Sequence, residues 1–283
     1  MSEAVLRVTE LRTVIDAAEG AVRAVDGIDL TLHRGRTFAV LGESGCGKSM
    51  TAFSLLRLLP PGGRIDGGRV LLGDRDLLRL PEVEMRRVRG ARIAMIFQEP
   101  QTSLNPVLTV GAQIGEGLRR HRGLRGAAAR RRAAELLDQV GIPDPERRLG
   151  EYPHQLSGGM KQRVMVAMAL AGEPDILIAD EPTTALDVTI QAQVLTLLRR
   201  IQADTGMAML LITHDLGVVA EMADEVGVMY AGHLVETGER DAFFAHPRHP
   251  YSRRLFEALP TAGRRGGGLA SIPGSVPSLA RVF

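Results

Sequence analysis

Short apolar runs, each bounded by turn or polar residues, recur along most of the chain. Near the N-terminus apolar and polar residues alternate, which predicts β-strands between Ala4 and Val40. The later runs are almost entirely apolar, as expected for strands buried on both faces of a largely parallel sheet. These later runs are RVLLG (69–73), RIAMIF (92–97), DILIAD (175–180), AMLLIT (208–213) and EVGVMY (225–230).

Longer stretches with helical spacing lie between and beyond these runs. An apolar helix is predicted over 48–59, where Pro60 and Pro61 would end it. Residues 188–206 place apolar side chains on one helical face, and Gly206 would close that helix. We expect an inserted helical subdomain at about 99–172 within a larger domain spanning 1–245. Residues 246–283 are rich in Pro and Gly, which indicates an extension with little core of its own.

Composition limits the class of protein. The 283 residues are 45% hydrophobic and 24% charged, enough for one large or two small globular domains. No run reaches the roughly 18–20 apolar residues that span a bilayer, and the N-terminus does not read as a signal peptide. We therefore expect a cytosolic protein whose membrane role, if any, runs through a partner. Cys46 is the single cysteine, which fits a reducing compartment.

Charge gives little support for nucleic-acid binding. The formal net charge is only +2. The basic run 119–132 favours a solvated helix face, with nucleic-acid binding as its alternative. Of 35 basic residues only Lys48 and Lys161 are lysines, and each lies in a glycine-containing motif.

The first of these motifs is a phosphate-binding loop. Gly42-x4-Gly47-Lys48-Ser49 stands between a predicted strand and a predicted helix, the context that this pattern requires. Loop amides would bind phosphates, Lys48 the β and γ oxygens, and Ser49 Mg²⁺. Cys46 either fills the loop as a small residue or carries a thiolate activated by the helix N-terminus. The candidate nucleotide-binding residues here are Gly42, Glu43, Ser44, Gly45, Cys46, Gly47, Lys48, Ser49 and Met50.

Polar residues follow three of the predicted buried strands. Asp180 and Glu181 end the run ILIADE. Two adjacent carboxylates at the end of a buried strand require a positive charge nearby. Asp180 would meet Mg²⁺ through its water shell, and Glu181 would deprotonate the attacking water. His214 and Gln98 follow neighbouring runs, where His214 would contact the γ-phosphate and Gln98 would sense Mg²⁺ and water.

Together with LSGGMKQR (156–163), these motifs make the chain resemble the ATP-binding subunit of an ABC transporter over about 5–238. The resemblance implies an α/β fold with a RecA-like P-loop core, an N-terminal antiparallel β subdomain and an inserted α-helical subdomain. It implies an ATPase using ATP and Mg²⁺. It also implies that two such subunits pair head to tail. The family's signature motif corresponds to residues 156–162 and its D-loop to 185–187. Residues of these two motifs would then complete the partner's nucleotide site, namely Ser157, Gly158, Gly159, Gln162 and Asp187.

Further stretches, among them FQEPQTSLNPVLTVGAQIGE and HPRHPYSRRLFEALP, resemble importers of oligopeptides, dipeptides and nickel. This implies a non-identical second ATPase, two membrane permease subunits, a solute-binding protein acting indirectly, no nucleic acid, and a peripheral place on the cytoplasmic face of the membrane. Nickel or another small solute, a soluble ABC ATPase, and a non-hydrolysing nucleotide switch remain alternatives. Two departures stand out: the expected adenine-stacking aromatic is missing near Val14 and Ile15, and no cysteine follows Cys46.

Overall fold

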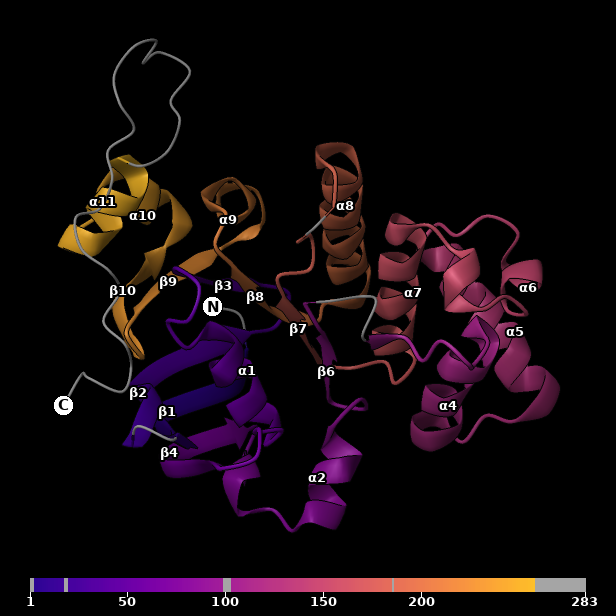
Figure 1. The fold of residues 1–283 in the computed structure, drawn as a ribbon, viewed down its shortest axis with the longest axis horizontal. Helices are drawn as coiled ribbons and strands as arrows, with labels where there is room; N and C mark the ends of the chain where they lie inside the picture. Colours follow the sequence, from indigo (N-terminus) through magenta and orange to yellow (C-terminus); the bar gives the residue numbers. More distant parts are fainter. Residues whose placement is uncertain (1–2, 18–19, 99–102, 185, 258–283) are drawn as a thin grey trace.

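The computed structural model describes residues 3–17, 20–98, 103–184 and 186–257, arranged around two β-sheets (Figure 1). A four-stranded antiparallel sheet has the order β2-β1-β4-β5. A six-stranded sheet has the order β10-β9-β3-β8-β7-β6, and all its neighbours are parallel except β10 with β9. The expected α/β core with an N-terminal antiparallel subdomain and inserted helices is confirmed.

The elements have the following bounds. The antiparallel sheet contains β1 (Ala4–Ala17), β2 (Gly20–His33), β4 (Gly63–Leu72) and β5 (Arg75–Asp76). The larger sheet contains β3 (Thr37–Leu41), β6 (Ile93–Ile96), β7 (Ile176–Asp180), β8 (Ala208–Thr213), β9 (Glu225–Tyr230) and β10 (His233–Glu239). The α-helices are α1 (Lys48–Leu56), α2 (Glu82–Val88), α4 (Val110–Arg122), α5 (Gly126–Gln139), α6 (Pro145–Arg148), α7 (Gly158–Leu170), α8 (Val188–Thr205), α9 (Leu216–Met222), α10 (Arg240–Ala245) and α11 (Pro250–Glu257). Short 3₁₀ turns are η1 (Leu77–Arg79) and η2 (Pro153–Gln155).

Each face of the six-stranded sheet belongs to a different core, because successive side chains of a strand point to opposite faces. In β3, Phe38 and Val40 join the core shared with α1 and the antiparallel sheet. Ala39 and Leu41 join the core shared with α8, α9 and the helical part. Burial on both faces explains why these strands are continuous apolar runs.

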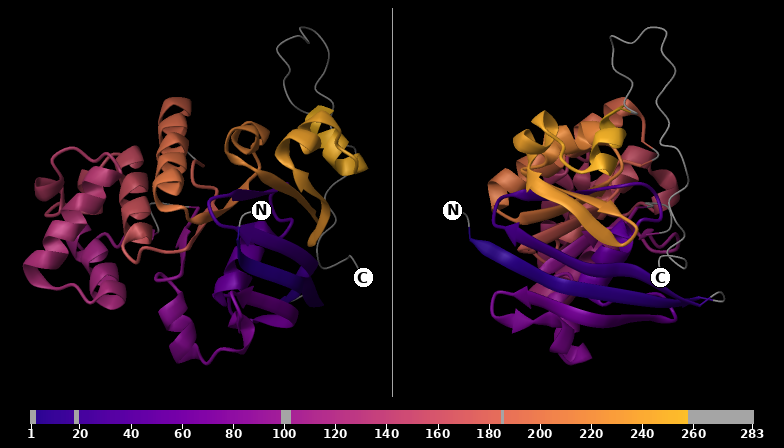
Figure 2. Two further views of the ribbon diagram at one scale, coloured as in Figure 1. Left: turned by 180° about the vertical axis from the view of Figure 1, so that it is seen from behind. Right: turned by 90° about the vertical axis from the view of Figure 1, so that its left-hand side faces the viewer.

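The helices α4–α7 lie between β6 and β7 in the sequence and occupy one end of the molecule, away from the antiparallel sheet (Figure 1). Figure 2 shows the same separation from behind, with α10 and α11 beside β10 at the opposite end. The segment 246–257 does not stand apart. Its helix α11 packs on the core that contains Ala39 and Leu41, where Tyr251 is 8% exposed. The predicted extension beyond Glu257 lies outside the described residues.

Two sequence expectations need correction, and one strand was not predicted. The run RVLLG belongs to β4 of the antiparallel sheet, since it pairs with β1 and not with a core strand. Helix α1 ends at Leu56, because Arg57 adopts the left-handed conformation and its N–H caps the helix. Strand β10 was not predicted, because its mostly polar, exposed residues lack an apolar period.

Candidate functional site

The phosphate-binding loop lies where β3 passes into α1, and two of its glycines are required by close backbone approach. A Cβ on Gly42 would lie 2.4 Å from the Met229 carbonyl oxygen, and one on Gly47 would lie 2.2 Å from that of Ala24. Gly47 also has φ +111, a conformation that favours glycine. Helix α1 begins at Lys48 with no side-chain cap, so its first N–H groups remain available to an anion.

Lys48 is directed back into this loop. Its Nζ donates to the carbonyl oxygens of Gly42 at 2.7 Å and Glu43 at 2.8 Å. The ammonium is thereby held beside the loop although the residue is only 5% exposed. A phosphate could replace these carbonyl oxygens as the acceptor, since a charged acceptor makes the stronger hydrogen bond.

The Cys46 thiol is enclosed within the phosphate-binding loop. Cys46 is fully buried, and burial raises the pKa of its thiol. Burial and the raised pKa favour the interpretation of Cys46 as a small residue that fills the loop.

Ser49 and Asp180 form an oxygen pair suited to Mg²⁺. Ser49 Oγ donates to Asp180 Oδ1 at 3.1 Å, and Asp180 is 2% exposed. Burial raises the pKa of Asp180, and the neighbouring charge of Glu181 acts in the same direction. A buried carboxylate beside another acid gains from a hard cation, and serine and carboxylate oxygens are the donors that Mg²⁺ prefers. The residues present fit the metal.

Glu181 stands at the centre of a cluster of strand-end side chains. β6, β7 and β8 are neighbours in one parallel sheet, so Gln98, Glu181 and His214 follow strands that end side by side. Gln98 Nε2 donates to Glu181 Oε2 at 3.0 Å, and His214 Nδ1 lies 3.2 Å from Glu181 Oε1. The structure brings these three predicted residues together.

Thr184 is a further member of the cluster that the sequence did not indicate. Its Oγ1 donates to Glu181 Oε2 at 2.7 Å, within the turn that follows β7. Glu181 has φ +45, and its N–H donates to the Ile212 carbonyl at 2.9 Å, so the side chain is held at a strained backbone position.

The environment keeps Glu181 ionised. Burial opposes ionisation, but hydrogen bonds from Thr184 and His214 and the charges of His214 and Lys48 outweigh it. The pKa of Glu181 is therefore lowered. The Glu181 side chain is 12% exposed, so one side remains open to a water molecule. An ionised, partly exposed carboxylate is suited to accept a proton.

The signature residues lie at the start of α7. Ser157 caps this helix by accepting from Met160 N–H, and both Ser157 and Gly158 are exposed. Gly159 packs against Ile190 of α8, where a Cβ would lie 2.9 Å from its Cγ2.

Gln162 differs from these, because its side chain points into its own subunit. It is 2% exposed, and its Nε2 donates to the Pro182 carbonyl at 2.6 Å. α7 is thereby connected to the residue directly after Glu181.

Other predicted residues have less defined surroundings. Ser44 and Gly45 are exposed in the loop, and Met50 is half-buried in α1. Asp187 is exposed and caps α8 by accepting from Ile190 N–H at 2.9 Å. Of the predicted D-loop, Ala185 lies outside the described residues.

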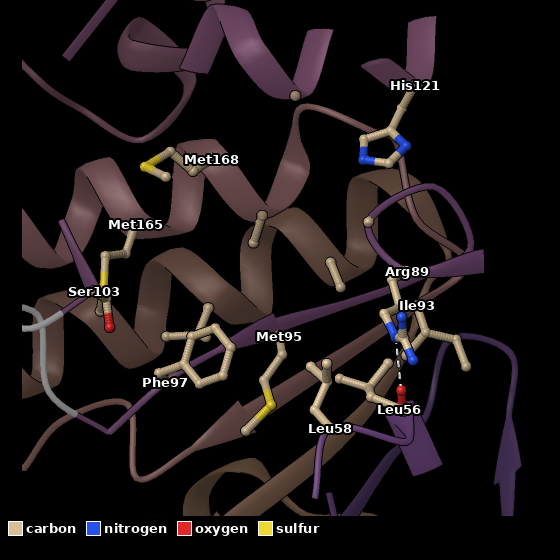
Figure 3. A pocket seen from close by; sticks show the side chains of 15 residues that line it. Leu56, Leu58, Arg89, Ile93, Met95, Phe97, Ser103, His121, Met165 and Met168 are labelled. Carbon is tan, nitrogen blue, oxygen red and sulfur yellow. Dashed lines mark hydrogen bonds between the residues drawn. The ribbon is translucent and has the colours of Figure 1, made fainter. Parts of the chain in front are cut away.

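An apolar cavity of about 260 Å³ lies beside Phe97, the residue before Gln98, between the sheet and the helical part (Figure 3). Phe97 and Leu58 line it and are 40% and 41% exposed. Met95 and Met168 lie on opposite sides of the opening, and His121 stands at one end.

The fold and these groups define a P-loop nucleoside triphosphatase. Residues 25–184 match the ABC transporter family model, and residues 235–283 match the model of the oligopeptide/dipeptide transporter C-terminal region. The chain belongs to the ABC transporter family, as one of its ATP-hydrolysing subunits.

Individual relatives agree with this assignment. The chain is 53% identical over 278 residues to the dipeptide transport ATP-binding protein DppD of Bacillus subtilis (strain 168), covering 98% of this chain and 83% of that protein. Among solved structures, the ATP-binding cassette MJ0796 in a dimeric post-hydrolysis state with ADP and Pi has a TM-score of 0.74 and 26% identity. It covers 83% of this chain and 98% of its own. The cbiO1 structure from Clostridium perfringens has a TM-score of 0.72 and 29% identity, covering 86% of this chain and 92% of its own.

Proposed function

We propose that the chain energises the import of di- or oligopeptides by binding and hydrolysing ATP for partner membrane subunits. The observation that carries the proposal is the match of 235–283 to the C-terminal region of oligopeptide and dipeptide transporters, on a chain with a complete hydrolysis cluster. The relative named for dipeptide transport supports the same substrate class.

In the proposed reaction, the amides of the loop 42–49 and the N-terminus of α1 bind the phosphates of ATP, with Lys48 on the β and γ oxygens. Ser49 and Asp180 would hold Mg²⁺, with Gln98 reaching it through water. The metal would supply positive charge that offsets the negative charge of the phosphate oxygens. Glu181 accepts the proton of the attacking water, and His214, beside it, contacts the γ-phosphate.

A second ATPase subunit is part of the proposal. Ser157 and Gly158 are exposed, as is Asp187, and the Ser157 hydroxyl is engaged within its own helix. We infer that these groups face the nucleotide of a paralogous, non-identical subunit in a head-to-tail pair. Gln162 would act indirectly, by holding α7 in place.

We propose that the cavity beside Phe97 is the surface that binds the membrane subunits. Among the described residues no helix has both the length and the apolar character needed to cross a membrane. We propose that an apolar segment of a permease binds between Phe97 and Leu58. Because Phe97 precedes Gln98, and Gln98 donates to Glu181, movement of that segment would be transmitted to the hydrolysis cluster. The subunit would then act peripherally at the cytoplasmic face of the membrane.

The test is reconstitution of the chain with its partner ATPase and two permeases in liposomes, with the solute-binding protein added. Di- or oligopeptides should stimulate ATP hydrolysis and accumulate in the lumen, whereas nickel should do neither. Glu181→Gln should retain ATP binding and lose about 10²- to 10⁴-fold in hydrolysis and in uptake. Stimulation by nickel alone would contradict the proposed substrate class.

A further inference from the structure

The described part of the C-terminal region contacts the phosphate-binding loop directly. Tyr251 of α11 accepts a hydrogen bond from the Glu43 N–H, with 3.4 Å between N and Oη. Its ring packs on Tyr230 at the end of β9, with 4.6 Å between centroids. Tyr230 follows Met229, whose carbonyl oxygen faces Gly42. The aromatic pair therefore stands beside the first residues of the loop.

α11 is held in this position by specific contacts with the core. Glu236 of β10 accepts from the N–H groups of Arg248 at 2.8 Å and His249 at 2.9 Å, just before the helix. His249 Nδ1 in turn accepts from the Tyr251 N–H at 3.2 Å. At the other end of α11, Phe256 packs on Phe243 with 5.3 Å between ring centroids. The orientation of Tyr251 is thus fixed by its surroundings.

A buried phenol usually finds some hydrogen-bond partner, so the contact alone does not establish a role. The position of Glu43 is what gives it one. Tyr251 engages the N–H of Glu43, and Lys48 Nζ engages its carbonyl oxygen at 2.8 Å. The residue that opens the loop after Gly42 is therefore restrained on both sides, from α11 and from the phosphate-binding lysine.

We propose that α11 positions the phosphate-binding loop, with Tyr251 as the positioning residue, so that the C-terminal region sets the affinity for ATP. Holding the loop in its binding conformation lowers the entropy lost when phosphates bind. The inference rests on the ATPase site and not on the transported solute, so a failure of peptide import would leave it standing.

The test measures binding of a fluorescent ATP analogue with Mg²⁺ to the full chain. Tyr251→Phe keeps the ring and removes the acceptor, and should weaken binding about two- to twelve-fold, the effect of one neutral hydrogen bond. In the reconstituted transporter KM for ATP should rise by the same factor with kcat unchanged, because Tyr251 does not contact Glu181. Tyr230→Phe, which removes a hydroxyl from the same aromatic pair, is the matched control and should bind like the wild type.

Glu236→Ala should weaken binding in the same direction, because it releases the start of α11. If both changes abolish the same positioning contact, their effects should not add. The double variant Glu236→Ala/Tyr251→Phe should then bind ATP about as tightly as whichever single variant binds it less tightly. Wild-type affinity in Tyr251→Phe would overturn the proposal, whatever its melting temperature. So would an equal loss in Tyr230→Phe, or additive losses in the double variant.

Discussion

Replacing Thr184 with valine should shift the pH dependence of ATP hydrolysis without abolishing the activity. The change is nearly isosteric and removes only the hydroxyl that donates to Glu181 Oε2 at 2.7 Å. Gln98 and His214 remain within hydrogen-bonding distance of the same carboxylate. The variant therefore tests the electrostatics of the general base with little change in packing.

The magnitude follows from the kind of bond that is lost. A hydrogen bond to a charged group contributes about 1.5–3 kcal/mol, and each 1.4 kcal/mol is tenfold in an equilibrium constant. Loss of the Thr184 hydrogen bond should increase the equilibrium constant for protonation of Glu181 by about 10- to 150-fold. The increase should be nearer 10-fold, because Gln98 and His214 still contact the carboxylate. Since the pKa of Glu181 starts below its ordinary value, the carboxylate should stay ionised near neutral pH. The rate there should change little, and the loss should appear on the acid side.

The assay is kcat/KM for ATP hydrolysis between about pH 4 and 8, measured for the wild type, Thr184→Val and Glu181→Gln. The proton-accepting form of Glu181 exists above its pKa, so raising that pKa moves the acid limb to higher pH. In Glu181→Gln the limb should vanish, leaving a low, flat rate. An acid limb that stays in place in Thr184→Val, or a uniform loss at every pH, would refute the assignment of this limb to Glu181.

Three further predictions concern other groups of the site. Ser157→Arg introduced in this chain alone should prevent ATP trapping at the partner's site and spare the Lys48 site; site-resolved trapping in the heterodimer showing the reverse would mean that the signature acts in cis. Burial raises the pKa of Asp180, so its ionised form destabilises the nucleotide-free fold at neutral pH. Asp180→Asn should therefore raise the melting temperature by about 2–4 °C, the shift given by about 1 kcal/mol, while removing the stabilisation by Mg-ATP. A lower melting temperature would contradict this. Cys46 should resist alkylation in the folded chain with or without Mg-ATP, because the thiol is fully buried; rapid labelling without nucleotide would indicate that the loop opens.

The fold could be predicted for strands that are buried on both faces, because such strands are continuous apolar runs in the sequence. β7 and β8 lie where such runs predicted them, and α8 ends at Gly206 as expected. RVLLG was misplaced because an apolar run does not say which sheet it joins; that depends on pairing with β1. Strand β10 was missed because it is largely exposed and buries little apolar surface. Its residues therefore show no alternation of apolar and polar positions.

The site could be predicted to the extent that loops and strand ends fix it. Parallel neighbouring strands end together, so Gln98, Glu181 and His214 converge whatever lies elsewhere. Thr184 could not be found this way, since a threonine in a turn gives no sign of where its hydroxyl points. The contact of Tyr251 with Glu43 joins residues 208 positions apart and depends on how α11 packs, which no local pattern encodes.

The hydrogen bond from Gln162 to the Pro182 carbonyl has a consequence for cooperativity. In a head-to-tail pair, α7 would present Ser157 to the neighbour's nucleotide, while Gln162 on the same helix binds the residue next to Glu181. A shift of α7 caused by nucleotide at one site would then displace the general base of the other. Such coupling is reciprocal: if ATP at one site alters binding at the second, the second alters the first by the same factor. The two ATP molecules would then be bound as an interdependent pair.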